Sequence, residues 1–481
     1  MKVDRLHDIN KCKVLIYGDF MVDKYIMGNV KRISPEAPVP ILEVTKKNSK
    51  LGGAGNVVNN ILALGASTRV LGCVGDDADG MWILNRLNKR NADTAFMRTD
   101  SEVMTIVKTR VVSKNQQYIR LDEERIEDIP DSYEQYVREH IEEILADIQV
   151  IIISDYGKGA VTKKIAGFLI ECANERNIPV VVDPKGKDYS KYKGATVCTP
   201  NTNELKVVTG ITSEAEEELT KAGFALRDEI SLQYLMLTRS EKGISVFDGD
   251  KKKDYPAVEK DVVDVTGAGD TVVSVVALGL AVGYEIGECS KLANLAASVV
   301  CSKFGAATLS MNELLECILY SGEFKNIDAE VAVFIAENLR EKGKKVVFTN
   351  GCFDLVHAGH ISSFNQAKAF GDVLIVAVNS DASVKRIKGE KRPIVSQQNR
   401  IAMLCALECV DYVILMEDDN PINLIKAIKP DITVKGKDWE HKHLPEREVV
   451  ESYGGEVKFI EMEEGLSTTN IISKIIEINK D

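Results

Sequence analysis

The sequence predicts an α/β protein of two domains, each built on a mainly parallel sheet with helices on both faces. Short apolar runs alternate with helical segments in both halves of the chain, which is the pattern of βαβ units. A chain of 481 residues is longer than one hydrophobic core usually serves. The pattern weakens between 305 and 345, and the two halves do not resemble each other. We therefore expect a first domain over 1–318, a linker with a connecting helix over 319–343, and a second domain over 344–481.

The composition is that of an ordinary globular chain, with 44% apolar and 28% charged residues. The formal net charge of −12 argues against nucleic acid or an anionic membrane as a partner. No apolar run is long enough to span a bilayer, and residues 1–13 lack the apolar core of a signal peptide. The ten cysteines are scattered without Cys-x-x-Cys pairs. This pattern favours reduced thiols in a cytoplasmic protein.

The first half begins with a buried strand at 14–17, and a helix opens at 51–56. Extended segments at 24–45 and in a hairpin over 103–121 do not fit the alternation of strands and helices. We expect them to form a small separate sheet, a lid over the site. The remaining expected strands are 69–74, 150–154, 179–183, 195–199, 234–238 and 243–247. The remaining expected helices are 162–175, 203–209, 214–228, 269–283 and 286–302.

The second half repeats the strand–helix alternation after a connecting helix at 328–340. The expected strands are 345–349, 372–378, 411–415, 431–434 and 456–459. The expected helices are 360–370, 396–407, 420–428 and 469–478.

The strongest motif of the first half is 264–270, with the sequence DVTGAGD. Gly267, Ala268 and Gly269 leave backbone N–H groups uncovered where a long apolar helix opens, and such a turn binds anions. Asp270 stands at the edge of this site, where a carboxylate suits general-base work on a hydroxyl that attacks a phosphate. The alternative is an aspartate that only caps the helix.

Two further groups of residues in the first half are candidates for ligand contact. Asp19 and Asp23 come after the first strand, at the edge of the sheet where α/β proteins bind ligands. The cluster Gly52–Asn56 (GGAGN) has no expected strand directly before it, which weakens a dinucleotide-binding interpretation. We interpret it as a helix start that lets the backbone approach a sugar, with a tight turn as the alternative.

The segment 200–204 (PNTNE) follows another strand. Its Asn201-x-x-Glu204 spacing puts two oxygen-bearing side chains on one helix face. Such oxygens suit a water-coordinated Mg²⁺, and a capping box explains the spacing equally well.

Together these motifs resemble the PfkB/ribokinase family of sugar kinases over about residues 10–310. The resemblance implies that Asp270 is the catalytic base and that the N–H groups of 267–269 form an anion hole. It implies sugar contacts near Gly52, Gly53 and Asn56. Further implied positions bind Mg²⁺ and ATP: Asn201, Thr202, Asn203, Glu204, Thr238, Gly243 and Asn294. The family's lid sheet accounts for the extended segments, and in many members it forms a dimer, so a homodimer through the lid is expected.

The strongest motif of the second half is 349–360 (TNGCFDLVHAGH), directly after a strand. His357 and His360 are two of only six histidines in the chain. Zinc is the competing interpretation, but no His-Glu-x-x-His pattern or cysteine partner stands nearby. Two imidazoles at a helix N-terminus can instead hold an α-phosphate and its developing charge.

This motif resembles the His-x-Gly-His signature of the nucleotidyltransferase superfamily, a Rossmann-like fold, over about 344–475. The resemblance implies nucleotide contacts from Asn350, Gly351 and Phe353. It also implies contacts from Ser467, Thr468 and Thr469, which match a second, hydroxyl-rich signature. The sequence 462–466 (MEEGL) replaces the arginine-bearing part that cytidylyltransferases carry there.

The pairing of the two halves resembles the bifunctional heptose kinase/adenylyltransferase family of ADP-heptose synthesis. That resemblance implies phosphorylation of D-glycero-β-D-manno-heptose 7-phosphate at O1 by ATP. It further implies transfer of AMP from ATP to heptose 1-phosphate, with a separate phosphatase acting in between. Lys158 and Lys185 follow strands and can hold the 7-phosphate as point charges, or they are solvated surface lysines.

Two alternatives remain. The first is another sugar kinase fused to a cytidylyltransferase. The second is a chain in which one half has become a nucleotide-sensing or scaffold module, which predicts lost catalytic residues. Asp270, His357, His360 and the run 467–470 are all present.

Overall fold

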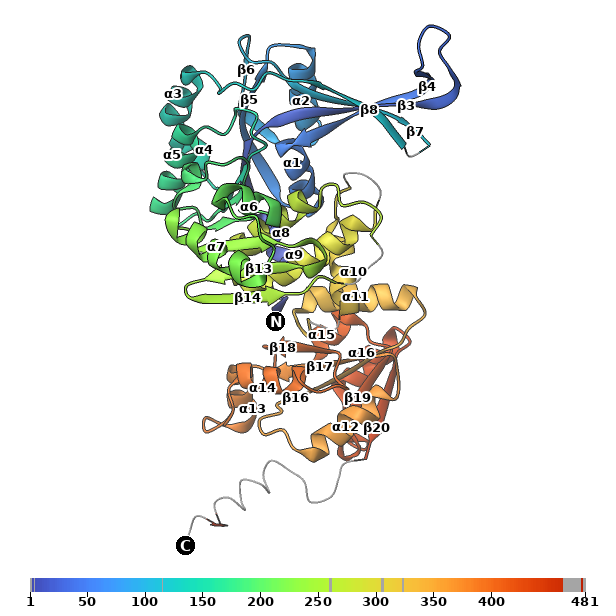
Figure 1. Cartoon of the computed structure of the whole chain (residues 1–481). Helices are drawn as coiled ribbons and strands as arrows, with labels where there is room; N and C mark the ends of the chain where they lie inside the picture. Colours follow the sequence, from blue (N-terminus) through green and yellow to red (C-terminus); the bar gives the residue numbers. More distant parts are fainter. Residues whose placement is uncertain are drawn as a thin grey trace. The chain divides into compact units, whose positions relative to one another are not determined.

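The computed structural model describes residues 2–3, 5–114, 116–258, 262–303, 307–321, 324–461 and 477–478. The chain divides into two compact units (Figure 1). The first unit is Asp8–Leu314, and the second unit combines Met1–His7 with Leu315–Asp481. All ten cysteines are free. Among the helices described, none is both long and apolar enough to cross a bilayer.

The first unit is built on a nine-stranded sheet with the order β14-β13-β12-β11-β10-β9-β2-β5-β6. Neighbouring strands are parallel except for the β12/β13 and β13/β14 pairs at one edge. The strands are β2 (Lys13–Gly18), β5 (Ser67–Gly75), β6 (Asp93–Asp100), β9 (Val150–Ser154), β10 (Val180–Asp183), β11 (Val197–Cys198), β12 (Tyr234–Thr238), β13 (Ile244–Asp248) and β14 (Lys251–Tyr255). The predicted mainly parallel sheet is confirmed.

Helices cover both faces of this sheet, because successive side chains of a strand point to opposite faces. Leu15 and Tyr17 of β2 belong to a core shared with one helical layer, and Val14 and Ile16 are buried on the other face. The first layer contains α3 (Asp131–Glu139), α4 (Ile141–Leu145), α5 (Lys163–Glu175), α6 (Thr202–Thr209) and α7 (Glu216–Glu229). The second contains α1 (Ala54–Ala63), α8 (Ala268–Ala281) and α9 (Ile286–Cys301). Helix α2 (Ala78–Asn88) packs beside β5 and β6.

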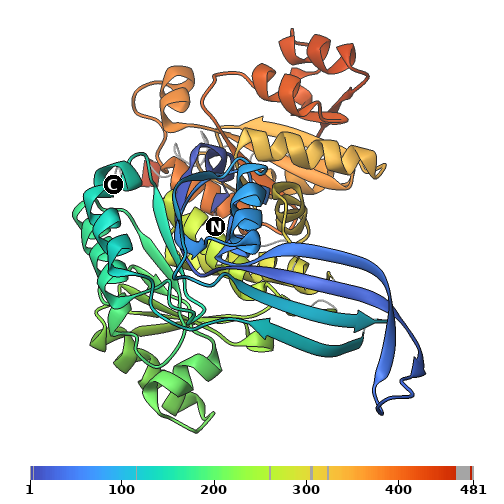
Figure 2. The ribbon, with the colours of Figure 1, turned by 90° about the horizontal axis from the view of Figure 1, so that it is seen from above.

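A separate four-stranded sheet projects from the first unit, as Figures 1 and 2 show. Its strands are β3 (Phe20–Ile33), β4 (Pro40–Gly53), β7 (Ile106–Ser113) and β8 (Gln116–Glu123), in the order β4-β3-β7-β8. The predicted small sheet is therefore confirmed. Strand β4 runs directly into α1, so the expectation that no strand precedes the Gly52–Asn56 cluster is wrong. The reason is that β4 pairs along its length with β3, which the polar sequence of β4 does not reveal.

The second unit contains a seven-stranded parallel sheet with the order β1-β15-β18-β17-β16-β19-β20. Its strands are β1 (Lys2–Val3), β15 (Asn326–Ile327), β16 (Val346–Gly351), β17 (Val373–Asn379), β18 (Tyr412–Met416), β19 (Ile432–Gly436) and β20 (Glu456–Ile460). Its helices are α10 (Met311–Ser321, which begins in the first unit), α11 (Ala329–Glu341), α12 (Ala358–Lys368), α13 (Asp381–Lys388), α14 (Gln397–Cys405), α15 (Ile422–Ile428) and α16 (Pro445–Ser452). The helix expected at 469–478 lies almost wholly outside the described residues.

The boundaries of the units differ from those expected at 318 and 344. Strand β1 pairs with β15, so the N-terminal residues extend the sheet of the second unit. His7 Nδ1 lies 3.1 Å from Oδ2 of Asp328, the residue that caps α11. Helix α11 is not a bridging linker, because Val331, Ile335 and Leu339 are buried and α11 packs on α15 and β16. A two-residue strand carries no periodicity, which is why the sequence did not indicate β1.

We expect deletion of residues 1–7 to destabilise the second unit by about 1–2 kcal/mol, because backbone pairing and a buried side chain are lost together. Thermal unfolding of 1–481 and 8–481 measures this change. The matched control compares fragments 1–314 and 8–314, whose midpoints should agree. Equal destabilisation of both pairs would contradict the assignment of β1 to the second unit.

Candidate active sites

The carboxyl edge of the nine-stranded sheet gathers several polar side chains of the first unit. Asp19 follows β2, Tyr156 follows β9, Asp183 ends β10 and Asn201 follows β11. Asp270 lies in the first turn of α8, which packs on β9 and β10. Ligands bind at this edge in open α/β sheets, so this edge is the candidate site of the first unit.

Asp270 is held in a defined orientation by two side chains. Asn56 Nδ2 donates to Asp270 Oδ2 at 2.6 Å, and the Tyr156 hydroxyl donates to Oδ1 at 2.8 Å. Asp270 is only 7% exposed, and burial raises its pKa, whereas the hydrogen bonds from Asn56 and Tyr156 lower it. A buried carboxylate with a raised pKa is a stronger proton acceptor than a free one.

The turn before α8 has the shape required for an anion site. Gly267 is the N-cap of α8 in the left-handed conformation, with φ at +85°, which favours glycine. Asp270 therefore lies three residues inside the helix, and its carboxylate contacts Asn56 and Tyr156, so the helix-capping alternative does not describe it. One expectation needs correction: the Ala268 N–H donates to the Val265 carbonyl at 3.2 Å, because a turn closes there. Gly269 has open space where a side chain would stand.

Gly52 and Gly53 lie against Asp23 of β3 and against Asp19, which directly precedes β3. A Cβ atom on Gly52 would stand 2.4 Å from Asp23 Oδ2, and one on Gly53 would stand 2.3 Å from the Asp19 carbonyl oxygen. Asp23 also pairs with Arg110 of β7. Glycine is required at both positions by close approach, and Gly53 additionally has a φ of +55°. The structure thus brings Asp23, Gly52, Gly53, Asn56 and Asp270 into one site.

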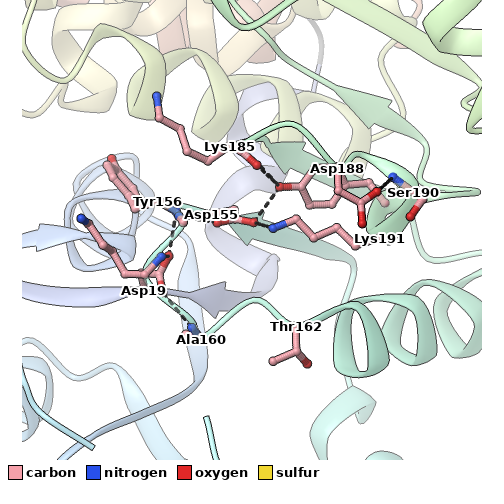
Figure 3. Close-up of polar contacts among 12 residues, drawn as sticks. Asp19, Asp155, Tyr156, Ala160, Thr162, Lys185, Asp188, Ser190 and Lys191 are labelled. Carbon is pink, nitrogen blue, oxygen red and sulfur yellow. Dashed lines mark hydrogen bonds and ion pairs between the residues drawn. The ribbon is translucent and has the colours of Figure 1, made fainter. Parts of the chain in front are cut away.

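Asp19 has a structural role rather than the predicted ligand role. Its carboxylate accepts hydrogen bonds from the backbone N–H groups of Tyr156, Lys158 and Ala160 at 2.7, 3.2 and 2.9 Å (Figure 3). Asp19 is 1% exposed, so these donors occupy its oxygens. Burial, followed by the charge of Asp155, raises its pKa to about 6. Asp19 therefore positions the turn that carries Tyr156.

The Asn201–Glu204 motif forms a capping box at the start of α6. The Glu204 N–H donates to Asn201 Oδ1 at 2.9 Å, and the Asn201 N–H donates to Glu204 Oε2 at 3.0 Å. Glu204 Oε1 also accepts from Lys185 Nζ at 2.7 Å. Thr202 and Asn203 are the first two residues of α6. The structure thus contains the capping box that was the alternative interpretation of this motif. A capping box still allows Asn201 and Glu204 to contact a cation through water.

Asp183 is a site residue that sequence reasoning missed. Burial, followed by the charges of Asp270 and Glu204, raises its pKa well above the usual range. A divalent cation would relieve this accumulation of negative charge. No group of three or more His, Cys, Asp or Glu side chains within the described ranges could hold a metal by itself, so phosphates and water would complete the shell of a magnesium ion.

The three residues expected at the nucleotide lie around the end of β14. Asn294 Nδ2 donates to the carbonyl oxygens of Tyr255 and Pro256 at 3.0 and 3.1 Å. Gly243 has a φ of +81°, and a Cβ there would stand 2.2 Å from the carbonyl oxygen of Tyr255. Thr238 pairs with Ile244 across the β12/β13 ladder. In this structure Asn294 and Gly243 shape the backbone around 255–256.

In the second unit, the two histidines lie at the start of α12 with their rings stacked at a centroid distance of 3.9 Å. The backbone N–H of His357 donates to His360 Nδ1 at 3.4 Å. Burial and the neighbouring His357 lower the pKa of His360 to about 4. Its imidazole is therefore neutral at pH 7 and offers one N–H donor at a helix N-terminus, where anions bind.

The loop before α12 is held by a cation from β19 and a cation from α14. Asn350 Oδ1 accepts from Lys435 Nζ of β19 at 2.8 Å, and Lys435 also pairs with Glu446 at 2.7 Å. The fully buried Arg400 donates to the Cys352 and Asn379 carbonyls at 2.6 and 2.8 Å. Lys435 and Arg400 were missed as site residues, since they lie far from the motif in sequence.

Aromatic and glycine residues complete the same loop. Phe353 has a φ of +46° and packs edge-on against His360 at 5.4 Å. A Cβ on Gly351 would stand 2.9 Å from the Phe353 ring. The predicted residues Ser467, Thr468 and Thr469 lie outside the described residues.

Fold and site together define a ribokinase-like sugar kinase joined to a Rossmann-like nucleotidyltransferase. The chain matches the pfkB family of carbohydrate kinases over residues 11–313 and the cytidylyltransferase-like family over residues 348–474. The chain belongs to the pfkB carbohydrate kinase family and, over its full length, to the family of bifunctional HldE proteins.

Relatives of the full chain share its two-part organisation. Bifunctional protein HldE of Geotalea uraniireducens is 43% identical over 96% of this chain and 95% of its own length. The protein of the same name from Helicobacter hepaticus is 43% identical over 96% of each chain. Among solved structures, Escherichia coli phosphofructokinase-2 superposes with a TM-score of 0.54 at 19% identity, over 64% of this chain and 98% of its own. Arabidopsis thaliana ribokinase gives a TM-score of 0.51 at 19% identity, over 64% and 99%. These two structures support the fold of the first unit.

We expect Tyr156→Phe to shift the acid limb of the kinase kcat/KM profile to higher pH by up to about one unit. In the wild type the hydrogen bond from Tyr156 lowers the pKa of Asp270. Its loss therefore raises that pKa. A pH profile of sugar phosphorylation measures this, and the exposed Tyr118→Phe is the matched control. An unshifted limb with reduced kcat at every pH would contradict the role of Tyr156.

We expect the second unit to lose stability as the pH falls from 6.5 to 4. The pKa of His360 is near 6.5 in the unfolded chain and about 4 in the folded chain, so as the pH falls the unfolded chain is protonated first and is stabilised relative to the folded chain. His360→Asn should remove about 1–2 kcal/mol of this pH dependence after screening. Unfolding free energies at pH 7 and pH 4.5 test it, with the exposed His441→Asn as control.

Proposed function

We propose that the first unit phosphorylates O1 of D-glycero-β-D-manno-heptose 7-phosphate with ATP, and that the second unit transfers AMP from ATP to heptose 1-phosphate. The observation that carries the first proposal is the buried Asp270 carboxylate, held by Asn56 and Tyr156 beside the glycine turn of α8. The full-length kinship with bifunctional HldE proteins supports the pairing of the two activities.

In the kinase step Asp270 accepts the proton of the sugar hydroxyl. The hydroxyl oxygen then bonds to the γ-phosphorus of ATP, and the bond to the β–γ bridging oxygen breaks, releasing ADP. Backbone N–H groups at the start of α8 face the transferred phosphoryl group and stabilise its charge. Glu204, Asn201 and Asp183 would hold magnesium through water molecules, and the ion would neutralise charge on the phosphates when bound.

In the adenylyl step the sugar 1-phosphate oxygen bonds to the α-phosphorus of ATP, and pyrophosphate leaves. The imidazole N–H groups of His357 and His360 suit stabilisation of the charge that develops on the α-phosphate. The alternative nucleotide is CTP, because the matched family is cytidylyltransferase-like. The sequence 462–466 lacks the arginine-bearing cytidylyltransferase signature, which favours ATP.

We further propose a cytoplasmic homodimer formed through the lid. The support is a set of exposed apolar side chains on the four-stranded sheet, among them Ile33, Val44, Ile119 and Leu121. Such side chains on a projecting sheet favour contact with a second copy. The partners are otherwise sugar phosphates and ATP, since the net charge of −12 disfavours nucleic acid.

The two sites are expected to fail independently. Asp270→Asn should lower kinase kcat by about 10²–10⁴ and leave adenylyl transfer unchanged, and His360→Ala should lower adenylyl transfer by about 10²–10³ and spare the kinase. Release of nucleoside diphosphate with heptose 7-phosphate measures the kinase step, and release of pyrophosphate with heptose 1-phosphate measures the adenylyl step. Each assay is run once with ATP and once with CTP. Near-normal phosphorylation by Asp270→Asn would exclude it as the base.

A further inference from the structure

A buried ion pair of the second unit lies where the strand order of its sheet reverses. After β16 the chain adds β17 and β18 on one side of that strand, and then β19 and β20 on the other. Open parallel sheets bind ligands outside the carboxyl ends of the two strands at such a reversal, here β16 and β19. Asn350 is the last residue but one of β16, and Lys435 has the same place in β19.

Lys435 fixes the orientation of the Asn350 amide. Lys435 Nζ donates to Asn350 Oδ1 at 2.8 Å and to Glu446 Oε1 at 2.7 Å. An ammonium group can only donate, so the amide oxygen of Asn350 must face Lys435 and its NH2 group must lie on the other side. Among the described residues, none accepts a hydrogen bond from Asn350 Nδ2. The partly exposed Asn350 therefore offers a donor at the carboxyl edge of the sheet.

The ion pair itself is almost completely buried. The side chains of Lys435 and Glu446 are 12% and 8% exposed, and Glu446 reaches the lysine from α16. Taking two charges out of water is costly, so a buried ion pair gains little stability over apolar residues of similar size. Stability does not by itself account for this pair, whereas control of the Asn350 amide does. Glu446 also cancels the charge of Lys435, so the pair adds no net charge to the site.

Asn350 lies beside the loop that leads to the two histidines. A Cβ on the next residue, Gly351, would stand 2.9 Å from the Phe353 ring, and that ring packs edge-on against His360 at 5.4 Å. Direct packing thus links the end of β16 to the start of α12, where anions bind. A nucleotide with a phosphate at the start of α12 would have the end of β16, and with it Asn350, beside it.

We propose that Asn350 donates through its NH2 group to an oxygen of the bound nucleotide, and that Lys435 and Glu446 are positioning residues that hold this amide. The inference rests on the proposed nucleotidyl transfer, and it gives Lys435 a role that acts only through Asn350. The contact holds the nucleotide equally before and during the reaction, so its loss should weaken nucleotide binding and leave the chemical step unchanged.

The first test removes both charges at once, because Lys435→Met alone would leave Glu446 buried without a partner. We expect Lys435→Met/Glu446→Leu to raise the KM for ATP in adenylyl transfer about tenfold, with kcat and the KM for heptose 1-phosphate within about threefold. Lys368→Met is the matched control, since it breaks the ion pair with Asp411 at the opposite edge of the same sheet. A KM for ATP equal to that of the control would overturn the inference.

A mutant cycle tests whether Lys435 acts through Asn350. Asn350→Ala should raise the KM for ATP about tenfold, because the same donor is lost. Adding Asn350→Ala to Lys435→Met/Glu446→Leu should then cause no further rise, since coupled residues are not additive. Two effects that multiply would show that Lys435 meets the ligand by itself, and the positioning role would be wrong.

A binding measurement distinguishes this inference from the proposed function. Trp82 and Trp439 are the only tryptophans, and Trp439 belongs to the second unit, so in Trp82→Phe the fluorescence reports unfolding of that unit. ATP should raise its unfolding midpoint in this background and with Lys368→Met added, but by less with Lys435→Met/Glu446→Leu added. If ATP has this effect while heptose 1-phosphate is not adenylylated, the proposed activity fails and the positioning pair stands. If ATP raises the midpoint equally in all three proteins, or in none, the positioning pair is wrong.

Discussion

The carboxylate of Asp19 accepts three backbone hydrogen bonds from one turn, and the geometry of the kinase site depends on them. The same residue joins two more segments, because its N–H donates to Ser154 and its carbonyl accepts from Ala54. One buried residue thereby fixes the end of β9, the turn that carries Tyr156 and Lys158, and the start of α1 that carries Asn56. The two hydrogen-bond donors to the Asp270 carboxylate, Asn56 and Tyr156, are thus positioned by one residue. A strong internal hydrogen-bond network of this kind fixes a site before substrate arrives.

Sequence reasoning located the motifs but not the contacts made across the chain. Asp270 and Asn56 were both singled out, and the structure places them 2.6 Å apart although 214 positions separate them. Tyr156, 114 positions from Asp270, and Lys435, 85 positions from Asn350, were missed as site residues. Their motifs were visible, but the partner of a polar side chain depends on which strands are neighbours, and strand order is not written in local pattern.

The roles of charged residues also could not be predicted from their positions in the sequence. Asp19 and Glu204 stood where ligand-binding carboxylates are expected, yet backbone donors occupy Asp19 and a capping box engages Glu204. A carboxylate is equally suited to backbone N–H groups and to substrate, so position at a strand end cannot separate the two uses.

The pairing of β1 with β15 has a consequence for how the chain is made. His7 and Asp328 are 321 positions apart, so during synthesis β1 waits for a further 321 residues before its strand partner β15 exists. At about 5–20 residues per second this delay lasts on the order of 15–65 seconds. The whole of the first unit, Asp8–Leu314, is made during that time, whereas the outer edge of the second sheet is completed only by residues that precede this unit. Synthesis therefore closes a loop in the chain, and the second unit takes an edge strand from a segment that precedes the whole of the first unit.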